Sequence, residues 1–283
     1  DYFTGNPTIF QQKEYTTTQT LSGAVHVLNC LFRSCISSGN GGALYCSSVT
    51  FLLVESSSFF SCRISDHYGG AISFSNSNGQ CVLHEVCGYD CISTHTDWSQ
   101  GQFIHTDVNN ALSSKNYINY SSIVRCVNGI SNSHYMLFIY NGKICCPSVN
   151  ISMNKCYSRS GIYCCPFYYS DSVTCSLSYS TFSDNIATDC ICIKLWTEGA
   201  KYELKSCNII RNTQGSLGSC ATFYTNGNVM IEDSCILENN ANIIFYSHFY
   251  TLTLSNCTVD KTTSAGSFNI QNTVTKSFIH ALN

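Results

Sequence analysis

The chain has few prolines, few charged residues and no long apolar run. Only 3 of its 283 residues are proline, charged residues make up 11% and the net charge is −3 at pH 7. This balance gives no basic footprint for nucleic acid. No apolar stretch approaches the ~18 residues of a membrane-spanning helix. The sequence therefore predicts no nucleic-acid partner and no membrane span within this chain.

Groups that hold metals or cofactors are also scarce. The chain has no Asp-rich triplet for calcium and no C-x-x-C spacing for zinc, so we expect no metal and no cofactor. A glycosidase needs two carboxyl groups roughly 5–9 Å apart. The best available pair is Asp184 and Asp189, which is more often a solvated turn, and we expect no catalytic residues. A carbohydrate-active enzyme (polysaccharide lyase or glycoside hydrolase) remains the alternative.

The chain does contain an internal repeat. In its first unit, apolar Val25 and Val27, small Cys30 and apolar Phe32 lead to Cys35. Eight further units keep this spacing, and the last residue of each unit, here called its anchor, lies 23 to 35 residues from the next one. The anchors are Cys35, Cys62, Cys91, Cys126, Asn154, Asn185, Asn212, Asn239 and Thr262, with Cys156 as an alternative to Asn154.

This repeat predicts the fold. A period of about 28 residues indicates a stack of units that bury their apolar faces only against one another. The apolar positions alternate, which predicts strands. We therefore expect an all-β, right-handed parallel β-helix (solenoid) of about nine coils over residues 21–283. Residues 1–20 are expected to form a partial coil or cap. Another coil begins near Val274, so the protein either continues beyond this chain or docks end to end.

The 20 cysteines admit two interpretations. The preferred one is a ladder of inward-facing thiols at the anchor positions, where a short polar side chain satisfies buried backbone groups. The rival is a set of disulfides between neighbouring coils, because the coil spacing falls in the allowed Cα separation. Abundant cysteine is typical of secreted proteins. Three N-x-S/T sequons, at Asn119, Asn150 and Asn256, predict glycosylation and agree with a secretory route.

Short motifs give a family resemblance. G-G-A-L at 41–44 and G-G-A-I at 69–72, together with F-S-D-N at 182–185, resemble the polymorphic outer-membrane protein repeat, G-G-A-I plus F-x-x-N. F-R-S-C at 32–35 matches the second motif with Cys for Asn. The cysteine-rich version is similar to large surface proteins of parasitic protists. The resemblance implies an extracellular, surface-displayed region of a longer protein, with adhesion as its expected role.

Two features suggest a binding surface. The longest unit has inserted segments at 92–101 and 106–115, and the first carries His95, Asp97 and Trp98 as candidate ligand-binding residues. The plainer interpretation is that these loops only cover the rod. Aromatic residues make up 13% of the chain and cluster at 167–169 and 245–250, where the outward half is suited to an interface.

The function expected from the sequence is a non-enzymatic extracellular or cell-surface module. Its role would be adhesion or protein/glycan binding, with filament formation as an extension. The expected partners are a protein or glycan of a host or neighbouring cell, or another copy of the chain through the coil ends.

Overall fold

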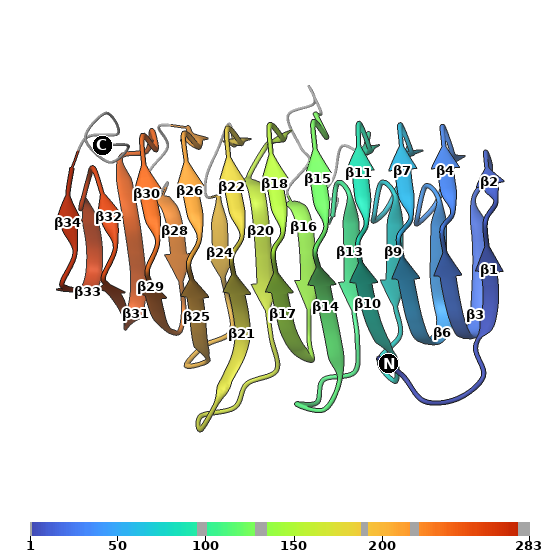
Figure 1. The fold of residues 1–283 in the computed structure, drawn as a ribbon, viewed down its shortest axis with the longest axis horizontal. Coiled ribbons are helices and arrows are strands. Elements are labelled where there is room, and N and C mark those ends of the chain that lie inside the picture. The colour runs from blue at the N-terminus through green and yellow to red at the C-terminus, as the bar shows by residue number, and fades with distance from the viewer. Residues whose placement is uncertain (1, 95–100, 128–134, 188–191, 216–220, 277–283) are drawn as a thin grey trace.

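The structure is a computed structural model that describes residues 2–94, 101–127, 135–187, 192–215 and 221–276. Within these ranges the chain forms 34 strands and no helix. Neighbouring strands run parallel, and they stack into a rod of coils (Figure 1). The predicted all-β parallel β-helix is thereby confirmed. The same residues include no helix long and apolar enough to cross a membrane.

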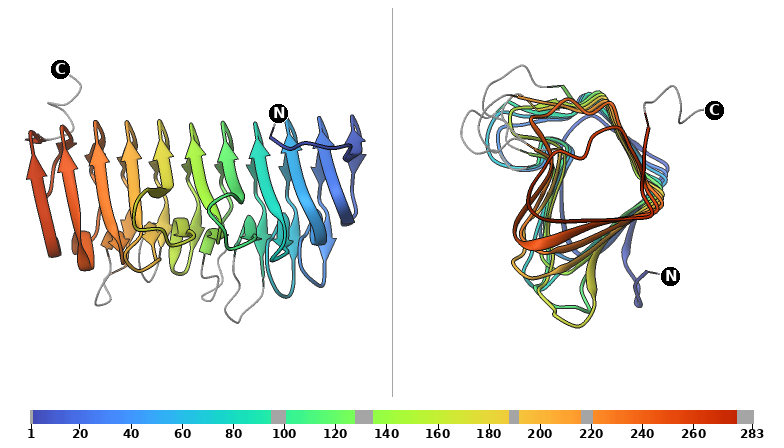
Figure 2. Two further views of the ribbon diagram at one scale, coloured as in Figure 1. Left: turned by 90° about the horizontal axis from the view of Figure 1, so that it is seen from below. Right: turned by 90° about the vertical axis from the view of Figure 1, so that its left-hand side faces the viewer.

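Each coil contributes to three walls, and the coils superpose on a triangular outline when viewed along the rod (Figure 2). Walls 1 and 2 share one 17-stranded sheet, because several long strands bend from one wall into the other. Wall 1 consists of β1 (Thr8–Gln11), the later parts of β3 (Gln19–Leu28) and β6 (Leu44–Glu55), β10 (Gln80–His84), β14 (Lys115–Asn119), β17 (Lys143–Pro147), β21 (Val173–Ser178), β25 (Lys201–Lys205), β29 (Asn228–Glu232) and the later parts of β31 (Ile243–Ser255) and β33 (Ser264–Gln271).

Wall 2 precedes wall 1 along the chain in each coil and forms a second side of the triangular outline. It consists of the first parts of β3, β6, β31 and β33 with β9 (Ile72–Ser75), β13 (Ile104–Asp107), β16 (Tyr135–Tyr140), β20 (Arg159–Cys165), β24 (Ile193–Leu195) and β28 (Ala221–Thr225).

Wall 3 is a separate sheet of 11 short strands. They are β2 (Glu14–Tyr15), β4 (Leu31–Arg33), β7 (Ser58–Phe60), β11 (Cys87–Tyr89), β15 (Ser122–Val124), β18 (Asn150–Ser152), β22 (Thr181–Ser183), β26 (Asn208–Ile210), β30 (Cys235–Leu237), β32 (Thr258–Val259) and β34 (Val274–Thr275). Two three-stranded sheets lie between walls 3 and 2, formed by β5 (Ile36–Ser37), β8 (Arg63–Ile64) and β12 (Ile92–Ser93), and by β19 (Lys155–Cys156), β23 (Ile186–Ala187) and β27 (Thr213–Gln214).

The strand register coincides with the alignment of the sequence repeat. On wall 1, Val25 lies opposite Leu52, which lies opposite Cys81. On wall 3, Phe32 lies opposite Phe59, which lies opposite Gly88. A side-chain period of two means that a slip by one residue would turn every core residue outward, so the apolar pattern fixes this register.

The interior is filled by stacked rings. Tyr15, Phe32 and Phe59 stack on successive coils with ring centroids 5.0 and 4.8 Å apart. The next coil has Gly88 in this position, and a Cβ atom there would lie 2.3 Å from the ring of Phe103. Phe103, from the neighbouring wall, therefore occupies the space that a fourth ring would fill. This packing explains the one glycine in an otherwise apolar column.

Residues with a positive φ turn the chain at two corners of each coil. Ser56 and Glu85 (φ 46° and 55°) lie between walls 1 and 3, and Ser61 and Asp90 (φ 51° and 52°) follow wall 3. A non-glycine residue in this region costs ~1–2 kcal/mol. The cost recurs on successive coils, so these corners need compensating interactions. At the second corner the anchor residue supplies them, and at the first corner a small polar residue such as Ser57 does.

In the first half of the rod the anchors are thiols. The Sγ atoms of Cys35, Cys62 and Cys91 donate hydrogen bonds to backbone carbonyls of the preceding coil, at 3.4, 3.7 and 3.5 Å. No disulfide joins any of the 18 cysteines within the described ranges. The structure thus agrees with the thiol ladder rather than with disulfides between coils. Burial raises the pKa of the Cys91 thiol well above its ordinary value.

In the second half the anchors are amides. The Nδ2 atom of Asn185 donates to the carbonyl of Ile151 (2.8 Å) and to Oδ1 of Asn212 (2.9 Å). Its own Oδ1 accepts from the backbone N–H and Nδ2 of Asn154, at 3.1 and 3.2 Å. Asn212 and Asn239 continue the chain of bonds. Asn154, rather than Cys156, is therefore the anchor of its unit.

Candidate functional site

The outer side of wall 2 carries a row of aromatic side chains. Residues that alternate with the buried ones point outward, and the parallel register brings them opposite one another on successive coils. Because the repeat is interrupted by insertions, these residues are not equally spaced in the sequence. We call this row the aromatic column; it consists of His105, Phe138, Tyr163, Lys194, Tyr224 and Tyr246.

Strand spacing sets the ring spacing in the column. His105 and Phe138 have ring centroids 5.0 Å apart with planes 4° from parallel, and Phe138 and Tyr163 are 4.9 Å and 5° apart. Tyr224 and Tyr246 stack at 4.9 Å and 8°. Parallel strands lie ~4.8 Å apart, so rings at one register position stack without further adjustment. The column is a direct product of the backbone geometry.

A single cation replaces one ring in the column. The Nζ atom of Lys194 lies 3.9 Å from the ring centroid of Trp196, 5.2 Å from Tyr224 and 5.7 Å from Tyr163. Lys194 is only 7% exposed, so these cation–π contacts are largely desolvated and stronger than surface ones. Lys194 thereby links the two stacked segments of the column.

Exposure divides the column into two parts. His105 and Phe138 are buried, at 5% and 7% exposure, and burial lowers the pKa of His105 to about 4. Toward the C-terminal coils the rings open to solvent, with Trp196 38% and Phe249 85% exposed. We call this end of the column together with its neighbouring rings the open patch; it consists of Tyr224 and Tyr246 from the column and of Trp196, His248 and Phe249 beside them.

A bulge shapes the end of the open patch. β31 shifts register against β33 between Tyr246 and Thr251, and Phe249 has a φ of 69°. Bulges commonly redirect side chains at functional surfaces. Here the bulge brings the His248 ring within 6.4 Å of Tyr224 and leaves Phe249 outside the strand surface. The patch is therefore an exposed apolar surface that the core does not use.

The aromatic clusters expected from the sequence meet beside this patch. Tyr168, from the cluster at 167–169, and Tyr250, from the cluster at 245–250, both lie against the same backbone position, Gly199. Tyr168 is 53% exposed, and the hydroxyl of Tyr250 lies 3.4 Å from Glu198 Oε1. The two clusters are more than 75 residues apart in the sequence, so only the coil stacking brings them together.

Two carboxylates of the described residues lie beside nitrogen-bearing side chains rather than beside one another. Asp184 accepts two hydrogen bonds from Arg211, at 2.7 and 2.9 Å, and this arginine lowers the pKa of the carboxyl. Its proposed catalytic partner, Asp189, lies outside the described residues. Glu55 lies 2.9 Å from His26 Nε2. Within the described ranges, no three His, Cys, Asp or Glu residues are grouped so that they could hold a metal ion.

The candidate binding residues His95, Asp97 and Trp98 lie outside the described residues, so their role stays a prediction. The aromatic cluster expected at 245–250 supplies Tyr246 and Phe249 to the open patch. Trp196 and Tyr224 were not expected there, because they become its neighbours only once the register across the insertions is known. The sequence did contain a signal for the aromatic column. Each column residue directly follows an apolar core residue of the second strand in its unit, as Tyr224 follows Phe223.

The three sequons differ in accessibility. Asn256 is exposed, and its Nδ2 atom donates to Asp233 at 2.6 Å. Asn150 is half-buried and donates to Ser122 at 3.2 Å. Asn119 is only 6% exposed, beneath the chain's N-terminal segment. A glycan at Asn119 would require that segment to move.

Comparison with known proteins identifies no relative of this chain. No family model, no curated protein and no solved structure matches it.

Proposed function

We propose that this chain is a non-enzymatic extracellular or cell-surface module that mediates adhesion by binding a protein or glycan through the open patch. The observation that carries the proposal is the cluster of Trp196, Tyr224, Tyr246 and Phe249 on the outer side of wall 2. These rings lie outside the interior, where Trp196 and Phe249 are exposed and the two tyrosines are half-buried. Trp and Tyr are enriched where partners bind, because they offer large contact area at low entropic cost.

The remaining support comes from the scaffold. A rigid β-helix presents rings at fixed spacing, which limits the entropy lost on binding. The G-G-A and F-x-x-N resemblance and the exposed sequon at Asn256 favour surface display. At Gly41 (φ 68°) a Cβ atom would lie 2.0 Å from the carbonyl oxygen of Leu44, so the G-G-A motif serves the backbone rather than a reaction.

The test compares two rings of the open patch with an exposed ring elsewhere on the rod. Trp196→Ala with Phe249→Ala removes two patch rings, and Tyr179→Ala removes a ring that is 66% exposed at the corner between walls 1 and 3. Binding to a glycan array and to cultured cells, before and after protease or glycosidase treatment, identifies the partner class. We expect at least a tenfold loss for the patch variant and no change for the control.

Two outcomes would overturn this function. One is equal binding by the patch variant and the wild-type chain. The other is release of new reducing or unsaturated sugar ends from the bound polysaccharide, which would favour the lyase or hydrolase alternative.

A further inference from the structure

The N-terminal segment lies along the outside of wall 1. Residues 2–7, here called the strap, leave β1 at the end of the rod and run back past β3 and β6 toward β10 and β14 (Figures 1 and 2). The strap is not part of any strand. Its contacts with the wall come mainly from the side chains of Tyr2 and Phe3, far from the point where it joins β1.

Tyr2 is bound by three residues of the wall. Its hydroxyl lies 3.0 Å from Nδ1 of His84 and accepts a hydrogen bond from Nδ2 of Asn119 at 2.9 Å. The hydroxyl of Tyr2 therefore joins His84 to Asn119. The ammonium of Lys115 donates to the backbone carbonyl of Tyr2. These contacts recognise a phenol specifically, because a phenyl ring could not bridge the two side chains.

Phe3 fills the neighbouring position. Its ring centroid lies 5.1 Å from that of Phe51, and Nζ of Lys115 lies 5.3 Å from the Phe3 ring centroid. Tyr2 and Phe3 thus occupy adjacent sites, one polar and one apolar. We call this surface the strap groove, defined by Phe51, His84, Lys115 and Asn119.

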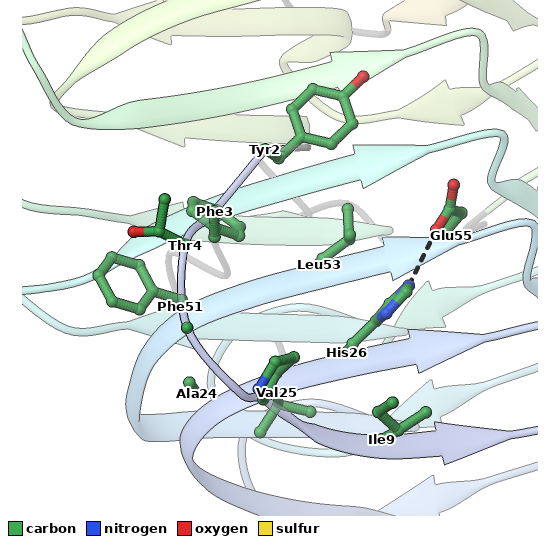
Figure 3. A pocket seen from close by; sticks show the side chains of 12 residues that line it. Tyr2, Phe3, Thr4, Ile9, Ala24, Val25, His26, Phe51, Leu53 and Glu55 are labelled. Atoms are coloured by element: carbon green, nitrogen blue, oxygen red, sulfur yellow. Dashed lines mark hydrogen bonds and ion pairs between the residues drawn. The ribbon is translucent and has the colours of Figure 1, made fainter.

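The rest of the strap stands away from the wall. A cavity of about 640 Å³ lies between residues 4–7 and the outer face of β3 and β6 (Figure 3). It is lined by Phe51 and Leu53 and by the hydrogen-bonded pair His26 and Glu55. Apart from its junction with β1, the strap is therefore held mainly through Tyr2 and Phe3. Releasing it from the wall breaks only the contacts of these two residues.

The strap crosses several strands, with bends at Phe3 and at Gly5 (φ 118°). From Tyr2 to Thr8 the chain can span at most ~20 Å. Reaching His84 and Asn119 from β1 means crossing three to four strand spacings, or ~14–19 Å. The fit is incomplete, since Oδ1 of Asn119 is buried without a hydrogen-bond partner among the described residues. A segment without this tether could settle further into the groove.

We propose that the strap groove is a binding site for an extended segment with adjacent Tyr and Phe side chains, and that its partner is the strap of a second copy of this chain. When two copies exchange their straps, each contact within a chain is replaced by the same contact between the chains. The exchange therefore costs only the association entropy. The tethered strap competes at an effective concentration in the millimolar range. Exchange therefore becomes favourable where copies are crowded, as on a surface, and it links copies without using the open patch.

The first experiment shortens the tether. Deleting residues 4–6 reduces the backbone span between Tyr2 and Thr8 to ~10 Å, less than the ~14 Å of three strand spacings, and so weakens the contact of Tyr2 with His84 in the same chain. Sedimentation and light scattering up to 1 mM should show a monomeric wild-type chain and a dimeric or larger deletion variant. The same deletion with Tyr2→Ala should return to monomer. A deletion variant that stays monomeric at 1 mM would show that a second copy is not the partner.

The second experiment tests the groove itself. The probe is a peptide with the sequence of residues 1–7, titrated into the full-length Tyr2→Ala, Phe3→Ala chain, whose groove is empty. We expect saturable binding, about tenfold weaker when the peptide carries Phe in place of Tyr and lost when the protein also carries His84→Ala. Lys205→Ala, at the same wall 1 position further along the rod, should change nothing. No binding at 5 mM peptide would overturn the site.

Discussion

The two halves of the rod solve the same problem with different side chains. The anchors from Cys35 to Cys126 are thiols, and those from Asn154 to Asn239 are amides. Both kinds of anchor donate to the carbonyl three residues before the preceding anchor, as Cys62 does to Phe32 and Asn212 does to Phe182, although the thiol of Cys126 donates to Val124 of its own coil instead. This shared bond shows what the corner requires, which is a buried donor.

The halves differ in what else the anchor can do. An amide has two N–H donors and a strong acceptor, whereas a thiol has one weak donor and a weak acceptor. The amide Oδ1 therefore also satisfies the anchor backbone N–H of the preceding coil, and Nδ2 reaches the next amide. Between thiols the equivalent contact is N–H of Cys91 to Sγ of Cys126, at 3.4 Å. The second half thus has a chain of strong N–H to oxygen bonds between its anchors, whereas the first half has only weak contacts between neighbouring thiols.

The largest expected effect comes from matched alanine substitutions in the two halves. Asn185→Ala removes four hydrogen bonds and leaves two buried backbone groups, the N–H of Asn154 and the carbonyl of Ile151, without a partner, each worth ~1–3 kcal/mol, so we expect a loss of about 4 kcal/mol in the free energy of unfolding. Cys62→Ala leaves one carbonyl and a small cavity, for about 1–2 kcal/mol. Urea unfolding under reducing conditions measures both. Equal losses would show that the amide chain adds nothing over the thiols.

The sequence could predict this comparison but not the functional surfaces. Apolar alternation and the spacing to Cys35 predicted the strand register, because each coil repeats the same local pattern. The Cys and Asn column could be read directly for the same reason. The aromatic column required the register across the insertions near 92–115. The strap groove depends on Tyr2 meeting Asn119, a contact between residues 117 apart that no local pattern encodes.

Alkaline pH should separate thiol from amide anchors. Burial raises the pKa of Cys91 above its ordinary value of 9.0, so the unfolded thiol ionises first. The stability from this thiol is complete below pH 9 and falls above it, by ~1.4 kcal/mol per pH unit. Cys91→Ser should reduce the slope of unfolding free energy against pH between 9 and 11 by this amount. Asn185→Ala should keep the wild-type slope. A Cys91→Ser slope equal to that of wild type would mean that this thiol ionises in the folded state.

Relief of corner strain should have a smaller effect. Met153 precedes the first amide anchor with a φ of 56°, and it is 41% exposed. Met153→Gly removes a strain of ~1–2 kcal/mol but increases the entropy of the unfolded chain by up to ~1 kcal/mol. We expect a net stabilisation of about 0.5 kcal/mol, measured by thermal unfolding. The matched change at Ser61 in the thiol half should give the same sign; destabilisation at both corners would show that the left-handed residues are not strained.

The smallest effect concerns the charges outside the anchors. In the amide half Arg211 binds Asp184 through two bonds, whereas in the thiol half Arg63 reaches Asp90 through one bond of 3.4 Å. Both pairs are more than a third exposed, so solvent screening limits Arg211→Ala to about 0.5 kcal/mol and Arg63→Ala to less.

The pH dependence distinguishes a real ion pair from lost packing. Arg211 lowers the pKa of Asp184, so the stabilisation is present above the ordinary carboxyl pKa and is lost as the pH falls through the lowered one. The difference between wild type and Arg211→Ala should therefore vanish at pH 2 and in 1 M salt. A difference that persists under both conditions would mean that Arg211 stabilises the corner through its aliphatic stem, and that its charge is incidental to the stability.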